Sequence, residues 1–430
     1  MRYFSTNGRS AVVGFREALL QGQPEDGGLY FPNEIPNLAE LAVRPWREGG
    51  EAETAFSLMR PYVGGEIPDA DLEAICGDAI DFPFPLAEIT PGIFALELFR
   101  GPTLAFKDVG ARFMSRCLGH FSGSIGKRTV VIVATSGDTG GAVAHGFAGV
   151  EGVSVVILFP KGRVSRVQEL QLTRSDKNVI TLEVHGSFDD CQRLAKTALS
   201  DRELRNKYFL TSANSINIAR WLPQQTYYFA ARRQFPDAKS VFSVPSGNFG
   251  NIAAGLIAKR AGLGARSFIA ACNANNVVPK YLETGQYIPE PSKRTLSNAM
   301  DVGDPSNLAR IRQLFNDDLD LIRENMATAS ISDEETVATI RKVHAEFGYT
   351  MDPHTAVGFA SLEKLAKSGP SEIGVVLATA HPVKFDSVSD ILSNNIDVPD
   401  AVARLGDRER RSIEIGNSYS EMIDAIKKSL

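Results

Sequence analysis

The chain of 430 residues has few cysteines and histidines, and their spacing excludes several kinds of site. Its four cysteines form no C-x-x-C pair, so neither a zinc site nor a disulfide framework is indicated, and we expect reduced core thiols. The six histidines show no H-E-x-x-H arrangement, so we predict no metal site and expect His145, His185 and His354 to be structural.

Long apolar runs and an excess of one charge are also missing. No segment approaches the roughly 20 apolar residues that a membrane span needs, and Met1 to Ser10 contains no apolar signal region. The formal net charge of −5 gives no overall footprint for nucleic acid or an anionic membrane. We therefore expect a cytoplasmic protein, monomeric or homodimeric, without nucleic-acid or membrane partners, although a local basic pocket for an anionic substrate remains open.

The usual nucleotide-binding loops are absent as well. Gly126-Lys127 is followed by Arg128, and Phe121 stands where a Walker loop has its first glycine. No G-x-G-x-x-G sequence follows a predicted strand. These absences make a nucleotide-binding oxidoreductase a weak hypothesis.

The chain does contain apolar runs that predict buried strands, and these runs alternate with segments that predict amphipathic helices. Near-continuous apolar, β-branched runs occupy residues 129–134, 153–158, 179–184, 241–244 and 375–378. Runs of this kind are typical of parallel sheets covered on both faces. The predicted fold class is therefore α/β, and in such sheets ligands lie at the carboxyl ends of the strands.

Two of these strands end in glycine-containing turns with polar side chains. The turn Ala134–Gly141 places Ser136, Asp138 and Thr139 where a helix begins. This arrangement suits the binding of an anion such as a carboxylate. The alternative interpretation is that these side chains only cap the helix. The turn after residue 244 lacks lysine and arginine, so it would cradle a phosphate with backbone amides and neutral donors. Its residues are Ser246, Gly247, Asn248, Phe249, Gly250 and Asn251.

A third strand end and one lysine complete the pattern. Thr379 ends the strand before His381 and Pro382, where its hydroxyl could bond a ring nitrogen or simply satisfy the strand end. Lys107 lies between Phe106 and Asp108 in an apolar turn, and desolvation would favour its neutral, nucleophilic amine. On its own, such a lysine is usually a solvated surface residue. The combination fits pyridoxal 5′-phosphate, which has an aldehyde, a phosphate and a ring nitrogen.

The motifs resemble those of the threonine synthase family, which is of the fold-type-II pyridoxal phosphate class with a tryptophan synthase β-like fold. The resemblance rests on GPTLAFKD (101–108), TSGDTG (135–140), SGNFGN (246–251) and ATAHP (378–382), in that order along the chain. Segments at 3–6 and 24–30 match the N-terminal extension of the longer members. The resemblance implies two parallel-sheet α/β domains and an N-terminal extension. The expected units are residues 1–95, a large cofactor-binding domain of 96–115 and 236–430, and a smaller domain of 116–235.

The resemblance also implies a reaction and the roles of individual residues in it. O-phospho-L-homoserine and water would give L-threonine and phosphate by γ-elimination and then β-addition of water. Lys107 would bind the cofactor and act as general base, Thr379 would face the pyridine nitrogen, and the turn at 246–251 would hold the cofactor phosphate. Ser136, Asp138 and Thr139 would contact the substrate carboxylate or the cofactor oxygen. Asp138 stands where many fold-type-II enzymes have Asn.

A further segment matches the family's substrate-phosphate residues. Asn214, Ser215 and Arg220 open a helix after a short strand, and an arginine grips a phosphate strongly. A capped helix with a surface arginine is the alternative, and the basic loop Lys161–Ser165 could contribute. Other activities stay open at this point, namely a serine/threonine dehydratase, which needs no phosphate clamp, and a catalytically silent cofactor-binding homologue.

Overall fold

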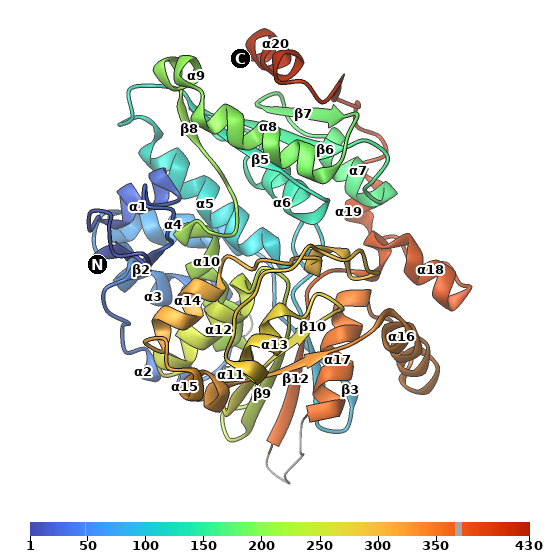
Figure 1. Ribbon diagram of the computed structural model, residues 1–430. Coiled ribbons are helices and arrows are strands. Elements are labelled where there is room, and N and C mark those ends of the chain that lie inside the picture. The colour runs from blue at the N-terminus through green and yellow to red at the C-terminus, as the bar shows by residue number, and fades with distance from the viewer. Residues whose placement is uncertain (48, 366–371) are drawn as a thin grey trace.

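The computed structural model describes residues 1–47, 49–365 and 372–430, and its centre is formed by two separate sheets (Figure 1). The larger sheet has the order β11-β10-β9-β12-β4-β3 and the smaller sheet the order β13-β7-β6-β5-β8. In Figure 1 the smaller sheet lies above the larger one, and the N-terminal helices stand beside both. The α/β class predicted from the apolar runs is confirmed.

The larger sheet is parallel except at one edge. Only the pair β3–β4 is antiparallel, and it joins the sheet through β12. The strands are β3 (Leu86–Thr90), β4 (Ile93–Glu97), β9 (Lys239–Pro245), β10 (Ser267–Cys272), β11 (Met326–Ser330) and β12 (Glu372–Ala378). The helices in this part of the chain are α11 (Gln225–Gln234), α12 (Gly250–Arg260), α13 (Val277–Thr284), α14 (Leu308–Leu314), α15 (Leu319–Asn325), α16 (Asp333–Phe347), α17 (Pro353–Leu365) and α18 (Asp386–Leu392).

The smaller sheet is parallel at every pairing. Its strands are β5 (Thr129–Ala134), β6 (Val153–Pro160), β7 (Val179–Val184), β8 (Phe209–Thr211) and β13 (Ile413–Ile415). Helices α5 (Lys107–Ser122), α6 (Asp138–Gly146), α7 (Arg166–Thr173), α8 (Phe188–Ser200), α9 (Arg202–Lys207), α19 (Asp400–Ala403) and α20 (Tyr419–Ser429) surround it or connect its strands. The side chains of β6 and β7 are buried along both strands, as expected for a sheet covered on both faces.

The N-terminal segment forms a small layer that packs against helices of both the larger-sheet and the smaller-sheet parts of the structure. Strands β1 (Tyr3–Ser5) and β2 (Tyr30–Pro32) pair antiparallel, and helices α1 (Phe15–Gln21), α2 (Ala39–Val43), α3 (Glu51–Val63) and α4 (Asp69–Ala79) pack on α5, α10 (Ile218–Trp221) and α11. Their apolar side chains belong to the same core as those of α5, β6 and α12. The N-terminal extension therefore shares one hydrophobic core with the elements of both sheets.

The division into units stays a proposal, which the sheet pairing refines. β13 pairs with β7, so the end of the chain lies with the smaller sheet rather than with the rest of 236–430. The four cysteines are buried and without disulfides, as expected. No helix among the described residues has the length and apolar character to cross a membrane.

Candidate active site

Lys107 begins α5, and the turn before it is fixed to the end of β12. The amide of Phe106 donates to the Thr379 carbonyl at 2.9 Å, and the amide of His381 donates to the Leu104 carbonyl at 3.1 Å. Leu104 takes a positive φ of 58°, an uncommon conformation for a leucine. These bonds place the predicted lysine beside the predicted ring-nitrogen partner, although 272 residues separate them in the sequence.

A cavity of about 150 Å³ lies between the two sheets and collects most of the predicted site residues. Side chains or backbone from five predicted segments line it. From the predicted set these are Lys107, Asp138, Thr139, Ser215, Arg220, Gly247, Asn248, Phe249, Gly250, Asn251 and Thr379. The ends of β5, β9 and β12 all lead into this one cavity, as expected for parallel strands.

The turn at 246–251 fits a phosphate. The amides of Gly250 and Asn251 open α12, where the first N–H groups of a helix have no partner inside it. Phe249 takes a positive φ of 59°, which bends the chain just before the helix. A Cβ on Gly247 would lie 2.6 Å from the Met300 Cα, so only glycine lets these two backbones approach. Backbone donors and a helix N-terminus therefore face the cavity without a lysine or arginine of this loop.

Two buried side chains at the cavity have polar atoms without a partner among the described residues. The Nε of Arg220 and the Nδ2 of Asn251 make no hydrogen bond, although both side chains are more than nine-tenths buried. The Arg220 Nη1 donates to the Ala213 carbonyl at 2.5 Å, which fixes the guanidinium in place. Burial lowers the pKa of Arg220 to about 10, against the attraction of Asp108, so the group is still a cation at neutral pH. A buried cation and an unused amide donor suit an anionic ligand.

Lys107 and Asp138 form the titratable pair of the cavity, with 3.5 Å between Nζ and Oδ2. Burial lowers the pKa of Lys107 despite the attraction of Asp138, and the Lys384 and Arg220 cations lower it further. A lowered pKa makes the neutral amine, which alone attacks an aldehyde, more abundant. The lysine is thus suited to covalent attachment of the predicted cofactor.

Three of the predicted residues do not line the cavity. Asn214 is exposed, Ser136 is half-buried, and the Ser246 hydroxyl donates to the Val244 carbonyl at 2.7 Å within its own strand end. Their proposed roles stay predictions.

Sequence reasoning left out several lining residues. They are Phe106, Gln224, Pro245, Ala299, Met300 and His354. The Nε2 of His354 accepts the Ala299 amide at 3.2 Å and its Nδ1 lies 2.7 Å from Asp352, so this histidine holds the segment that packs on Gly247. Its place after Asp352-Pro353 is a turn signal that could have drawn attention to it.

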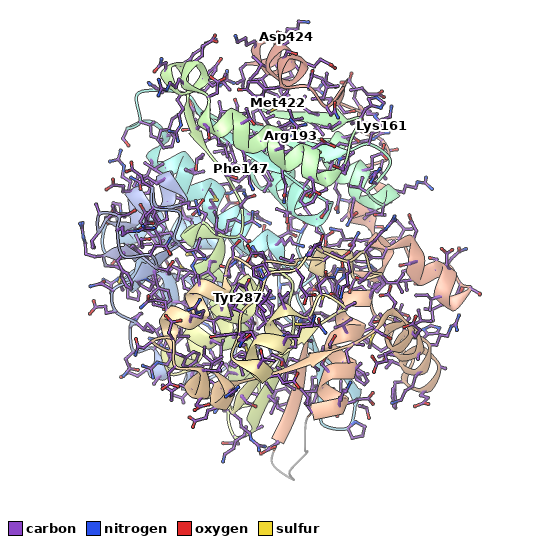
Figure 2. The ribbon with its side chains drawn as sticks, viewed as in Figure 1. Phe147, Lys161, Arg193, Tyr287, Met422 and Asp424 are labelled. Carbon is purple, nitrogen blue, oxygen red and sulfur yellow. The ribbon has the colours of Figure 1, made fainter. Side chains whose placement is uncertain are left out.

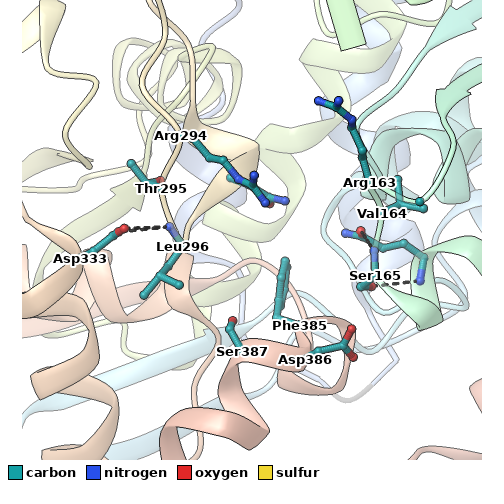
Figure 3. Close-up of a pocket in the computed structure, with 13 residues that line it drawn as sticks. Arg163, Val164, Ser165, Arg294, Thr295, Leu296, Asp333, Phe385, Asp386 and Ser387 are labelled. Carbon is teal, nitrogen blue, oxygen red and sulfur yellow. Dashed lines mark hydrogen bonds between the residues drawn. The ribbon is translucent and has the colours of Figure 1, made fainter. Parts of the chain in front are cut away.

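A larger cavity of about 560 Å³ adjoins the first one (Figure 3). Gln168 lines it and donates to Asp138 at 3.0 Å, and Asp138 lines the inner cavity. Arg163 and Arg294 lie on opposite walls of this outer cavity, as Figure 3 shows. Lys161, from the same basic loop, pairs instead with Glu414 at 2.5 Å and lies at the edge of the smaller-sheet body (Figure 2).

Family models match nearly the whole chain. "Pyridoxal-phosphate dependent enzyme" matches residues 84–380, "Threonine synthase N terminus" residues 2–80 and "Threonine synthase, C-terminal" residues 355–426. The chain belongs to the threonine synthase family. Its cofactor is pyridoxal phosphate, and the lysine, the amide-lined turn and the strand-end hydroxyl around one cavity fit that group.

Full-length similarity agrees with this assignment. The threonine synthase of Haemophilus influenzae is 43% identical over 97% of each chain. The pyridoxal-phosphate-bound threonine synthase structure from Brucella melitensis superposes with a TM-score of 0.94 at 37% identity, covering 100% of this chain and 99% of that one. The predicted class of enzyme, a pyridoxal-phosphate-dependent lyase of this family, is confirmed.

The dehydratase alternative is not favoured. A fungal L-serine ammonia-lyase structure from Rhizomucor miehei is similar with a TM-score of 0.56, but at only 15% identity over 74% of this chain. A likeness of this degree shows a shared fold alone. The family models for residues 2–80 and 355–426, which are specific to threonine synthases, distinguish this family.

Proposed function

We propose that this chain converts O-phospho-L-homoserine and water to L-threonine and phosphate. The main observation in support of this substrate is the position of Arg220. It is a buried cation with an unpartnered Nε, and it lines the same cavity as Lys107. The amide-lined turn at 246–251 has the features for the cofactor phosphate, so a second phosphate needs a second set of donors. Arg220, Ser215 and Asn251 supply one, and Asn214, which is exposed and precedes Ser215 in the chain, is the remaining predicted donor.

The chain's own groups have separate tasks in this proposal. Pyridoxal phosphate, when bound, would supply an electron sink that stabilises negative charge at the Cα of the substrate. Lys107 binds that cofactor and, once displaced by the substrate amine, its neutral Nζ removes the proton from Cα. Thr379, which lines the cavity, would offer the ring nitrogen of the cofactor a neutral hydroxyl rather than a carboxylate.

The substrate's two anionic ends go to different walls of the cavity. Thr139 and the N-terminus of α6 hold the carboxylate, with Ser136 beside them and Asp138 facing the cofactor's oxygen. Arg220 holds the γ-phosphate, and its grip strengthens as negative charge builds on the leaving group. A second proton leaves Cβ as the bond from Cγ to the phosphate oxygen breaks, and Cγ takes up a proton to become the methyl group. Water then adds at Cβ, a proton returns to Cα, and threonine and phosphate are released.

Product analysis tests the proposal directly. Purified protein with pyridoxal phosphate and O-phospho-L-homoserine should release threonine and inorganic phosphate in equal amounts. L-Serine under the same conditions is the control, and it should give little pyruvate. Rapid pyruvate formation from serine with no phosphate release from phosphohomoserine would contradict the proposal and restore the dehydratase. Cofactor binding without turnover of either substrate would leave the silent homologue.

A further inference from the structure

A second lysine lies buried beside the cavity, and neither the motifs nor the proposed reaction gives it a role. Lys384 lies in the 3₁₀ turn η3 (Pro382–Lys384), and its side chain is fully buried, with 0% exposure. Its Nζ lies 2.8 Å from the Asp138 Oδ1 and donates to the Thr103 carbonyl at 2.8 Å. A buried ammonium is costly unless it is paired and hydrogen-bonded, and here both conditions are met.

Asp138 is thereby shared unequally between two lysines. Its Oδ1 contacts Lys384 at 2.8 Å and accepts from Gln168 at 3.0 Å, whereas its Oδ2 stands 3.5 Å from the Lys107 Nζ. The shorter contact goes to the lysine that cannot reach solvent. Lys107 is left with the longer, weaker contact.

The other charged groups around Lys107 do not take the place of Asp138 as its counter-ion. Arg220 on α10 is a second cation, and His354 on α17 is held between Asp352 and the Ala299 amide. Asp108, next to Lys107 on α5, accepts from the Thr103 hydroxyl at 2.5 Å and the Thr103 amide at 2.9 Å. Asp138 is thus the carboxylate nearest to the Lys107 amine in the described structure.

We propose that Lys384 is a positioning residue for Lys107: it holds the Asp138 carboxylate in an ion pair, so that the Lys107 amine has no dedicated counter-ion. The inference rests on the proposed role of Lys107 as the cofactor lysine. It goes beyond that role by explaining how this lysine is kept reactive next to a carboxylate.

The electrostatics of the group support this arrangement. Burial alone would raise the pKa of Asp138, but Lys384, Lys107 and the hydrogen bonds hold it well below its ordinary value, so the carboxylate stays ionised. An ionised carboxylate without Lys384 would pair with Lys107 and stabilise its ammonium form. A nearby opposite charge raises a lysine pKa by about 1 to 3 units, so the neutral amine would become about 10- to 1,000-fold scarcer at neutral pH.

Competitive labelling with acetic anhydride, read by mass spectrometry of the Lys107 peptide, measures this directly in the cofactor-free full chain. In Lys384→Met the pH midpoint of Lys107 labelling should rise by at least about one unit. Lys384→Arg, which keeps a cation, should hold the parent midpoint. Lys342→Met is the matched control, because it removes an exposed ion pair of the same length, 2.8 Å to Glu363, on α16. An unchanged Lys107 midpoint in folded Lys384→Met would overturn the proposal.

Two further measurements keep the outcome decisive. If Lys384→Met does not fold, Lys384→Gln examines the same relation, because its amide can still donate to Asp138 but carries no charge: the Lys107 midpoint should rise, and no change would overturn the inference. Borohydride trapping of bound cofactor, followed by peptide mapping, reports separately whether Lys107 is the cofactor lysine. Failure of the proposed function is therefore distinguishable from failure of this inference.

Discussion

The side-chain amide of Asn248 donates to the hydroxyl of Ser215 at 2.8 Å. Asn248 belongs to the turn that suits the cofactor phosphate, and Ser215 to the segment expected to hold the substrate phosphate. The Asn248 Oδ1 also accepts the Ser306 amide at 2.7 Å, and its carbonyl accepts from Asn307 at 3.0 Å. The two proposed phosphate sites therefore share one fixed wall, which sets the distance between cofactor and leaving group.

Replacement of Lys107 by alanine should abolish covalent attachment of the cofactor. The side chain contributes no strong hydrogen bond to the fold, so we expect the variant to fold and to bind pyridoxal phosphate only reversibly. Absorbance near the violet edge of the visible spectrum, recorded before and after treatment with borohydride, shows whether the cofactor is covalently attached. A folded variant that still shows a borohydride-reducible band would exclude Lys107 as the cofactor lysine.

Gly247→Ala should weaken cofactor binding strongly. Its added Cβ would lie 2.6 Å from the Met300 Cα and 2.9 Å from the Ala299 carbonyl oxygen, so the turn must shift from the cavity wall. Gly250→Val should act in the same direction, because a Cβ there already meets Asn307 at 3.3 Å.

The matched control for these glycines is Gly77→Ala, at a helical position of α4 where a Cβ meets nothing within 4 Å. That change should stabilise the protein by about 0.4–1 kcal/mol and leave cofactor affinity alone. Titration of each apoprotein with pyridoxal phosphate measures the dissociation constants. Equal affinity in Gly247→Ala and Gly77→Ala would mean that the turn does not hold the cofactor phosphate.

Arg220→Ala should keep the cofactor spectrum but lose at least about tenfold in kcat/KM for O-phospho-L-homoserine. Charge-assisted hydrogen bonds contribute about 1.5–3 kcal/mol, or roughly 10- to 150-fold. Elimination from serine, which has no phosphate, should change little. If both substrates lose equally, Arg220 supports the cavity without binding phosphate, and Arg163 in the outer cavity becomes the better candidate.

His381 should make the protein less stable as the pH falls below neutrality. Burial lowers its pKa to about 4 from an ordinary 6.5, and its Nδ1 accepts the Val383 amide at 3.2 Å in the neutral form. Between pH 6.5 and 4 the unfolded chain binds the proton and the folded chain does not, so stability increases with pH in that window.

The variant His381→Asn tests this titration, because asparagine can still accept the Val383 amide but does not ionise. The difference in melting temperature between pH 7 and pH 5 should be smaller in the variant than in the parent. Calorimetric scans at the two pH values measure it. An identical difference in both proteins would show that His381 does not contribute to the acid sensitivity.

The sequence by itself determined five strands, which are β5, β6, β7, β9 and β12, and the chemistry at the ends of β5, β9 and β12. Near-continuous apolar runs such as 129–134 and 179–184 predict strands buried on both faces, and the structure has both with those bounds. The turns after β5, β9 and β12 were identified because parallel strands present their carboxyl ends at one edge. Lys107 was identified by its combination with these strand-end turns, because a lysine in such a turn is by itself usually a solvated surface residue.

Other features could be decided only by the tertiary structure, because they depend on which distant segments meet. Asn214 and Ser246 matched family motifs, yet Asn214 is exposed and the Ser246 hydroxyl donates within its own strand end. Gln224 and His354 line the cavity although neither was assigned to the site from the sequence, His354 in spite of the turn signal before it. Lys384 follows Thr379 by five residues and, like Lys107, adjoins a phenylalanine. Nothing local reveals that it meets Asp138, because that ion pair joins the end of the larger sheet to the first helix turn after a strand of the smaller sheet. A buried charge is placed by its partner, and the fold alone supplies that partner.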